Sequence, residues 1–195
     1  MRIEPFVTVV IPAFNEEGNL EQCINAVGQM LDSQGTNYEI LVINDGSQDN
    51  TGSIGNRLAI TDGRIRIIHH AAKRGIGAGF ISGLQNARGK LLFFMPADLP
   101  MEPAELDKYM SLAPGNDIVI GCSTVRSDCS WWRRLISWTN IRCIQFLFNI
   151  NFHQFFYCSM YRVEKLRLVG PWSVHWKPEK SLPIFTAYLF LKTES

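Results

Sequence analysis

The chain has 195 residues, of which 46% are hydrophobic and 19% are charged, and its formal net charge is +1. This length suits one domain with an appended segment and is sufficient for a sizeable core. Its five cysteines form no CxxC pair and no His–Cys metal spacing, and their odd number favours a reducing compartment. The chain opens without the apolar core of a signal peptide and has no run of about 18 apolar residues, so we expect a soluble or peripheral protein.

Segments of strand character recur through the first part of the chain. They lie at 7–11, 39–43, 65–69, 91–95 and 117–121. Between them, apolar residues return at helical spacing, as at Leu20, Ile24, Val27 and Leu31. Strands that alternate with helices of this length predict βαβ units, and therefore an α/β fold with a mainly parallel sheet and flanking helices.

The composition changes after Gly121. Residues 130–149 are rich in Trp, Phe and Arg and are expected to form one long helix. An interfacial helix with its rings at the level of lipid headgroups and a buried helix packed on the sheet both explain this composition. We therefore expect a core at 1–125 and an aromatic, basic helical segment at 126–195, which lies near the acceptor or a membrane and is truncated.

The charge is unevenly distributed between the two parts. Residues 1–120 carry 9 Lys and Arg against 14 Asp and Glu, whereas residues 121–195 carry 10 against 4. A basic, aromatic-rich segment behind an acidic domain indicates contact with an anionic partner, such as a membrane surface or a lipid phosphate. A merely solvated basic face is the alternative interpretation.

Polar and small residues end the first two strands abruptly. The first strand runs into Pro12, Ala13, Phe14 and Glu16, and the second runs into Asp45. Ligands of open α/β sheets bind at the carboxyl ends of the strands, where these residues would lie. The two strand ends therefore predict a site for a polar, phosphorylated ligand.

Asp45 and a glycine-rich turn are the candidates for nucleotide contacts. The Asp45 carboxylate can accept a hydrogen bond from a base or a ribose hydroxyl, whereas Asp49 and Asn50 are expected to cap the following helix. The segment from Lys73 to Gly79 precedes a helix, where backbone N–H groups and the helix N-terminus favour phosphate. It does not match a dinucleotide-binding fingerprint, which would follow the first strand.

Asp98 is the candidate metal ligand. It follows the most apolar strand in a turn framed by prolines, where a carboxylate can hold Mg²⁺ or Mn²⁺ against a pyrophosphate. The alternative is an ordinary structural turn residue.

Taken together, four segments resemble family 2 glycosyltransferases with the GT-A fold. They are Ile-Pro-Ala-Phe-Asn-Glu-Glu, Asn-Asp-Gly-Ser, Lys-Arg-Gly-Ile-Gly-Ala-Gly and Pro-Ala-Asp, beginning at Ile11, Asn44, Lys73 and Pro96. The likeness covers about residues 5–170 and is greatest to the dolichyl- and polyprenyl-phosphate sugar transferases. It implies an enzyme that moves a sugar from a UDP- or GDP-linked donor to a lipid phosphate, with inversion, using Mg²⁺ or Mn²⁺. It also implies a cytoplasmic protein, peripheral on the cytosolic face of a membrane or held by a membrane partner protein, with a role in cell envelope glycan synthesis and no nucleic-acid partner.

The resemblance also implies roles for individual residues. Those expected to border the nucleotide are Pro12, Ala13, Phe14, Glu16, Asp45, Lys73, Gly75 and Ala97, and Asp98 is expected to hold the metal. Those expected to meet the acceptor phosphate are Arg133 or Arg134, Ser137 and Asn140, with Arg126 as a further catalytic arginine. Arginine suits this task because its planar fork pairs bidentately with phosphate oxygens. A lipid phosphate is already an anionic nucleophile, so the resemblance implies no strong general base.

The sequence departs from the family pattern at several positions. Pro96 stands where the metal motif has its first Asp, Ser123 stands where an arginine is frequent, and residues 151–162 contain no acid. Two alternatives therefore stay open. One is a glycosyltransferase of the same fold acting on a saccharide, for which Asp98, Glu102 and Asp128 are the candidate bases. The other is a non-catalytic protein that binds a nucleotide sugar.

Overall fold

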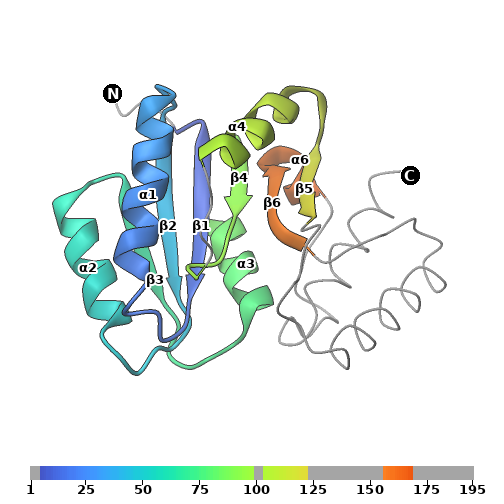
Figure 1. Cartoon of the computed structure of the whole chain (residues 1–195). Coiled ribbons are helices and arrows are strands. Elements are labelled where there is room, and N and C mark those ends of the chain that lie inside the picture. The colour runs from blue at the N-terminus through green and yellow to red at the C-terminus, as the bar shows by residue number, and fades with distance from the viewer. Residues whose placement is uncertain (1–4, 99–102, 123–155, 169–195) are drawn as a thin grey trace, which may run out of the picture.

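A computed structural model of the chain describes residues 5–98, 103–122 and 156–168 (Figure 1). Helices and strands alternate from β1 to β5, as the sequence predicts. In chain order the elements are β1 (Val7–Ala13), α1 (Leu20–Ser33), β2 (Tyr38–Asn44), α2 (Thr51–Thr61), β3 (Ile65–His69), α3 (Ile76–Asn86), β4 (Leu91–Phe94), α4 (Pro103–Leu112), the 3-10 helix η1 (Ala113–Gly115), β5 (Ile118–Cys122), β6 (Phe156–Arg162) and α6 (Val163–Leu168).

The strands form one six-stranded sheet in the order β3-β2-β1-β4-β6-β5. The first four pair in parallel, and β6 runs antiparallel to both of its neighbours, β4 and β5. The predicted α/β fold with a mainly parallel sheet is confirmed, and the five predicted strands agree with the observed ones to within one or two residues.

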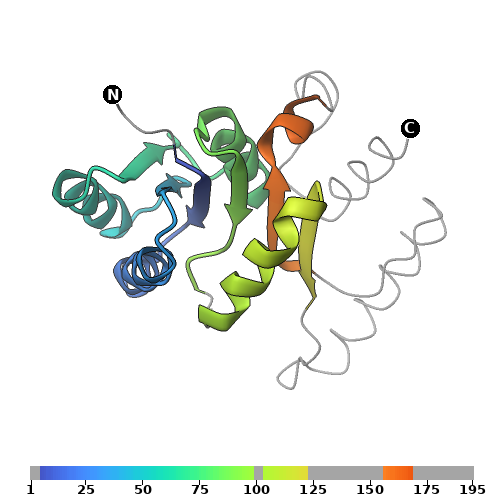
Figure 2. The same ribbon diagram turned by 90° about the horizontal axis from the view of Figure 1, so that it is seen from above.

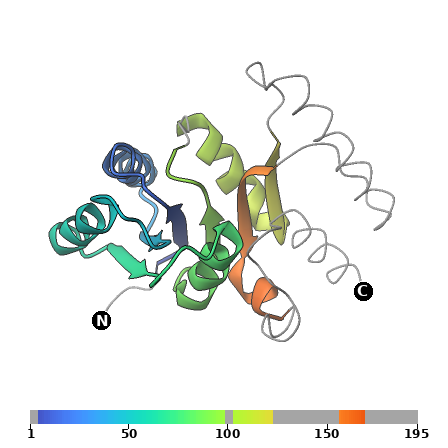
Figure 3. The same ribbon diagram turned by 90° about the horizontal axis from the view of Figure 1, so that it is seen from below.

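Helices cover both faces of this sheet (Figures 2 and 3). The helices α1, α2 and α4 pack on one face, and α3 and α6 pack on the other. Because β1 and β2 are covered on both faces, nearly all their residues are buried, which explains their continuous apolar runs.

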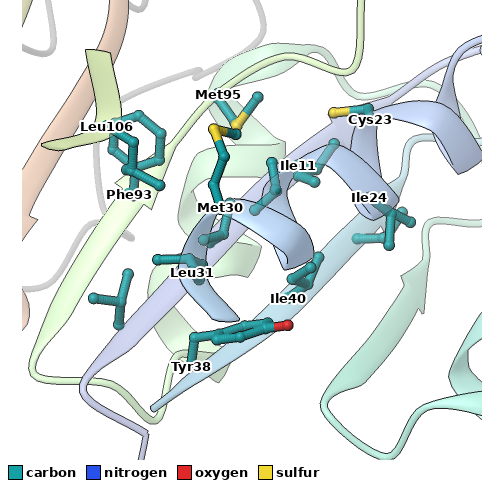
Figure 4. Packing of buried hydrophobic residues seen from close by; sticks show 14 of the residues in the cluster. Ile11, Cys23, Ile24, Met30, Leu31, Tyr38, Ile40, Phe93, Met95 and Leu106 are labelled. Atoms are coloured by element: carbon teal, nitrogen blue, oxygen red, sulfur yellow. The ribbon is translucent and has the colours of Figure 1, made fainter. Parts of the chain in front are cut away.

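The larger core lies between the sheet and α1 (Figure 4). Leu20, Ile24, Val27 and Leu31 form one stripe of α1 at helical spacing, and each is 2% exposed or less. Figure 4 shows Met30 and Leu31 of this helix turned toward the strands. Burial of each such side chain contributes about 1.5–3 kcal/mol, so this stripe fixes α1 on the sheet.

On the opposite face, α3 lies very close to β1. A Cβ atom on Gly83 would stand 2.4 Å from Cγ1 of Val10, so a larger residue there would push the helix away from the strand. The helix begins at Ile76, after the loop that follows β3, so its N-terminus lies at the carboxyl edge of the sheet (Figure 1).

The strand β6 was not expected from the sequence. It lies beyond residue 125, where we expected the separate segment, yet it occupies the sheet between β4 and β5. The helix expected over 130–149 lies outside the described residues. Within the ranges that the structure describes, no helix has the length and apolar character needed to cross a membrane.

Candidate functional site

The strand order reverses between β1 and β4. The chain passes from β1 outward to β2 and β3 and then crosses over to β4, which makes the carboxyl ends of β1 and β4 a topological switch point. The carbonyl of Val10 accepts from the Met95 N–H on the β4 side, and that of Ala13 accepts from the Asp45 N–H on the β2 side. The backbone of Pro12 is therefore directed toward β4. The pairing of β1 with β4 ends at Val10–Phe94, so the N–H that proline lacks would have no partner in the sheet and its absence costs no hydrogen bond.

The loops after β1 and β2 are joined to each other by hydrogen bonds. Asn15, at φ 56°, donates its backbone N–H to Oγ of Ser47 at 3.0 Å and accepts from the Gln48 N–H at 2.9 Å. The Glu16 N–H donates to Oγ1 of Thr51 at 2.8 Å. Thr51 is fully buried, so this contact ties the first loop to the start of α2.

Two carboxylates complete the connection between these loops. Asp49 accepts from the N–H groups of Glu17 and Thr51, and Glu17 accepts from the backbone and side chain of Asn50. Burial raises the pKa of Asp49, but the hydrogen bonds from Thr51 and Glu17 outweigh it and leave the pKa below its usual value. Asp49 therefore satisfies the first N–H of α2, whereas the side chain of Asn50, the residue at the N-cap position, makes no capping hydrogen bond.

Asp45, expected to meet the nucleotide, is 4% exposed and already has protein partners. Its Oδ1 accepts from the Arg74 N–H at 2.9 Å and lies 2.6 Å from Nδ1 of His70, while Oδ2 accepts from the Gly75 N–H at 2.7 Å. Burial raises the pKa of this carboxyl, yet the hydrogen bonds from His70, Arg74 and Gly75 hold it below its usual value. In this structure Asp45 holds the loop after β3, and its contact with a base or ribose stays a prediction.

Gly46 lets that loop lie directly against the end of β2. It has φ +73°, and a Cβ atom there would stand 2.5 Å from the carbonyl carbon of Ala72 and 2.6 Å from the backbone nitrogen of Lys73. Only glycine combines this backbone conformation with such a close approach.

A pocket of about 500 Å³ opens at this edge of the sheet. It is lined by the last residues of β2 and β3 and by the loops after β1, β2 and β3, namely Phe14, Asn44, Gly46, Ser47, Gln48, His69, His70, Ala71, Ala72 and Lys73. The ammonium of Lys73 lies 3.5 Å from the centre of the Phe14 ring, a cation–π contact. The pocket thus combines an aromatic ring, a cation and polar side chains, which suits a ligand that is both aromatic and anionic.

Asp98 lies at the end of the turn that follows β4. Its residue is exposed, whereas the preceding Ala97 is buried and Pro96 is half-buried. The pKa of the Cys23 thiol is raised to about 11, first by burial and then by the negative charges of Asp98 and Glu16. The charges of both carboxylates therefore act on this thiol of α1. Among the described residues, no three His, Cys, Asp or Glu side chains are grouped as a metal site.

The remaining predicted residues fall into two groups. Pro12 and Ala13 end β1 and Gly75 precedes α3, so these lie at the carboxyl edge with Phe14, Glu16, Lys73 and Ala97. The acceptor residues lie outside the described ranges, and they are Arg126, Arg133, Arg134, Ser137 and Asn140. Their roles stay predictions.

The sequence analysis gave no role of their own to Asn44 or to the two histidines at the end of β3, His69 and His70. Asn44 accepts from the Ser47 N–H at 3.1 Å and its Nδ2 lies 3.0 Å from Nδ1 of His69. His70 lies between Asp45 and Ser82 of α3. The available signal was their position, since polar residues at the ends of neighbouring parallel strands share one edge.

Comparison with known proteins agrees with this geometry. The profile of Glycosyl transferase family 2 matches residues 8–170, which is most of the chain. The chain belongs to glycosyl transferase family 2. The family resemblance seen in the sequence is thereby confirmed.

Two curated members of the family show how far the likeness extends. A dolichol-phosphate mannosyltransferase of Pyrococcus furiosus is 32% identical over 136 residues, which are 67% of this chain and 38% of that protein. A polyprenol monophosphomannose synthase of Mycolicibacterium smegmatis is 34% identical over 154 residues, covering 74% of this chain and 57% of that protein. The chain thus spans about two fifths to three fifths of the length of these relatives.

Solved structures confirm the fold. A mannosyltransferase from Pyrobaculum calidifontis, in complex with GDP-Man and Mn²⁺, superposes with a TM-score of 0.60 at 19% identity, covering 91% of this chain and 50% of that one. Glucosyl-3-phosphoglycerate synthase from Mycobacterium tuberculosis, in complex with Mn²⁺, UDP and phosphoglyceric acid, gives 0.63 at 21% identity, covering 83% and 57%. These neighbours are glycosyltransferases, and the GT-A-like fold expected for the chain is the fold observed.

Proposed function

We propose that this chain transfers a sugar from a nucleotide-diphosphate sugar to a polyprenyl or dolichyl phosphate, with inversion at the anomeric carbon. The observation that carries the proposal is the pocket of about 500 Å³ at the carboxyl edge of the sheet of a family 2 glycosyltransferase. The relatives named for transfer to dolichol phosphate and polyprenol phosphate support a lipid phosphate as the acceptor.

The donor's nucleoside would occupy this pocket. The Phe14 ring offers a face on which a base can stack, and Lys73 now covers that ring. A cation on an aromatic face contributes only about 0.5–1 kcal/mol at an exposed site, so an incoming base can displace it. The freed ammonium would then meet the diphosphate. Pro12, Ala13, Glu16, Asp45, Gly75 and Ala97 would border the bound nucleotide.

The residues present fit a divalent cation bound together with the donor. Asp98 is an exposed carboxylate beside the switch point, and the Glu16 charge acts on the same part of α1. Mg²⁺ and Mn²⁺ prefer oxygen ligands, and Mg²⁺ is commonly held by one or two carboxylates plus substrate phosphates and water. Asp98 would hold the ion, which when bound would neutralise charge on the diphosphate. The Mn²⁺ present with two structural neighbours supports this assignment.

The reaction needs alignment more than acid–base chemistry. An oxygen of the acceptor phosphate attacks the anomeric carbon, the bond from that carbon to the diphosphate oxygen breaks, and its electron pair leaves with the nucleoside diphosphate. The acceptor is already anionic, so no proton has to be removed. The protein contributes by holding donor and acceptor in line and by stabilising the departing charge.

Acceptor binding is assigned to the second part of the chain. Arg133, Arg134, Ser137 and Asn140 would meet the acceptor phosphate, with Arg126 beside them. Because a polyprenyl phosphate lies in a membrane, we place the protein at a membrane surface on the cytosolic side, alone or with a membrane partner protein. The excess of basic residues over 121–195 supports contact with an anionic surface.

A transfer assay tests the proposal. The chain is incubated with UDP-glucose or GDP-mannose, a short polyprenyl phosphate and Mn²⁺ or Mg²⁺, and the products are identified by mass spectrometry. We expect a polyprenyl-phosphate sugar from one donor, and no transfer to the matching polyprenyl alcohol, which would need a base. A product formed on a saccharide acceptor but never on the lipid phosphate would overturn the proposal.

Pro96 supports a second candidate, a non-catalytic protein that binds a nucleotide sugar. It stands where the metal motif has its first Asp, which leaves Asp98 as the single carboxylate of the described turn residues 95–98. The variant Pro96→Asp separates the candidates. A large gain in turnover would indicate that the wild type has lost catalytic activity through Pro96. Unchanged turnover in an active enzyme would show that Asp98 is sufficient.

Asp98→Asn tests the metal assignment. We expect it to remove the Mn²⁺-dependent part of nucleotide affinity, about tenfold or more, because the amide has no negative charge. Affinity is measured by calorimetry with and without Mn²⁺. Glu164→Gln, an exposed acid of α6, is the matched control and is expected to bind as the wild type does. Equal Mn²⁺ dependence in Asp98→Asn and wild type would contradict the assignment.

A further inference from the structure

His70 lies between the end of β2 and helix α3. Its side chain is 5% exposed, with Nδ1 at 2.6 Å from Oδ1 of Asp45 and Nε2 at 2.8 Å from Oγ of Ser82. The ring therefore joins a buried carboxylate to a hydroxyl on a helix that packs against β1 and β2. Both of its nitrogens are occupied, so the ring has one orientation.

The Asp45 carboxylate also fixes the role of Nδ1. A carboxylate accepts only, so Nδ1 carries a hydrogen and donates to Asp45. Nε2 pairs with the Ser82 hydroxyl, which can donate or accept. The neighbouring His69 has the opposite arrangement. Its Nδ1 accepts from the amide of Asn44, because the Asn44 oxygen is used by the Ser47 N–H. Nδ1 thus donates a hydrogen bond in His70 and accepts one in His69.

The carboxylate that His70 orients is the main attachment of the next loop. Residues 71–74 are exposed, and Asp45 receives the backbone N–H groups of both Arg74 and Gly75. The side chain of Lys73, which lies over Phe14, extends from the residue just before this attachment. Movement of the Asp45 carboxylate would therefore move the cation at the pocket.

We propose that His70 is a positioning residue for donor binding, which orients the Asp45 carboxylate and through it fixes the backbone at Arg74 and Gly75 with Lys73 above the pocket. This inference rests on the proposed function. His70 also lines the pocket, but Asp45 and Ser82 occupy both of its nitrogens, so its effect on a nucleotide is transmitted through the loop.

Three substitutions of His70 distinguish its contact with Asp45 from its contact with Ser82. His70→Ala removes both hydrogen bonds. His70→Asn places an amide N–H near the position of Nδ1 and keeps the contact with Asp45, whereas His70→Gln reaches toward Ser82 and leaves Asp45 without this donor. Val163→Ala, a truncation in the core at α6, is the control for lowered stability without any change near the loop.

The first readout is hydrogen exchange of the backbone amides of Arg74 and Gly75, which needs no ligand. We expect exchange to rise about tenfold in His70→Ala and His70→Gln and to stay within about threefold of wild type in His70→Asn. The second readout is the affinity for UDP or GDP with Mn²⁺, measured well below the melting temperature. It should fall about tenfold in the first two variants and recover in His70→Asn.

The outcomes are distinguishable. Unchanged exchange at Arg74 and Gly75 in His70→Ala would overturn the inference, and so would faster exchange with unchanged affinity. A similar loss of affinity in Val163→Ala would reduce His70 to a purely structural residue. If the wild type binds neither nucleotide, the proposed function fails, while the exchange data still decide whether His70 holds the loop.

Discussion

At Gly46 the absence of a side chain decides how close the loop after β3 can lie to the end of β2. The main-chain atoms of Ala72 and Lys73 occupy the space that a Cβ would take. The preceding residue, Asp45, binds the same loop through its carboxylate. Asp45 and Gly46 together therefore fix the position of the loop after β3, which lines the pocket.

Gly46→Ala is expected to lower the free energy of unfolding by about 1–3 kcal/mol, because the residue has φ +73° and its methyl group would meet backbone. The measurement is urea unfolding followed by circular dichroism. Gly63→Ala is the control, since a Cβ there has no neighbour within 4 Å, and it should change stability by no more than about 0.5 kcal/mol. Equal effects of the two substitutions would contradict the close approach.

The Asp45 carboxyl makes stability depend on pH in a defined direction. Its pKa is lower in the folded chain than its usual value, so its contribution is complete above the unfolded pKa of about 3.9 and is lost as the pH falls through the folded pKa. Asp45→Asn should cost about 1.5–3 kcal/mol at pH 7, measured by urea unfolding, and this difference should narrow below about pH 4. A difference that stays constant down to pH 2 would contradict the lowered pKa.

The position of single residues at the carboxyl edge was predictable where they follow a strand or belong to a glycine-rich turn. Phe14, Asp45, Lys73 and Gly75 all lie at this edge, and their contacts with a ligand stay predictions. The contact of His70 with Asp45 joins residues 25 positions apart, and its contact with Ser82 depends on how α3 packs. No local pattern encodes either contact.

At the scale of elements, the loops after β1 and β2 act as one unit. Their connection uses backbone N–H groups of one loop and side-chain oxygens of the other, so neither loop can move independently. Such preorganisation lowers the entropy lost when a ligand binds.

Thr51→Val tests this unit. It keeps the shape of the side chain but leaves the Glu16 N–H without its acceptor, so the free energy of unfolding should fall by about 1–3 kcal/mol. Chemical denaturation measures the change. Thr61→Val, at the exposed end of the same helix, removes only a contact with the Arg57 carbonyl and should change stability by about 0.5 kcal/mol or less. A near-neutral Thr51→Val would show that the loops are held by other contacts.

The elements themselves were predictable from apolar periodicity as far as β5. Strands buried on both faces give uninterrupted apolar runs, and the helices between them show their own spacing, as in α1. β6 was missed because its place in the sheet depends on antiparallel pairing with β4 and β5, which are distant in sequence. Its residues Phe156–Arg162 mix aromatic, small and charged side chains without a clear period.

At the scale of the whole molecule, the described part of the chain places its ligand chemistry at one edge of the sheet. The loops after β1, β2 and β3 lie at the carboxyl ends of the parallel strands (Figure 1). The residues that line the pocket belong to the same edge, and Asp98 follows β4 there. We therefore propose that this edge binds the nucleotide of a sugar donor together with a divalent ion.

Calorimetric titration of the chain with UDP and with GDP, each with and without Mn²⁺, tests that claim most directly. We predict that one of the two nucleotides binds and that Mn²⁺ strengthens its binding by about tenfold or more, which would also identify the base of the donor. Absence of binding by both nucleotides in the presence of Mn²⁺, in a chain shown to be folded, would contradict the account.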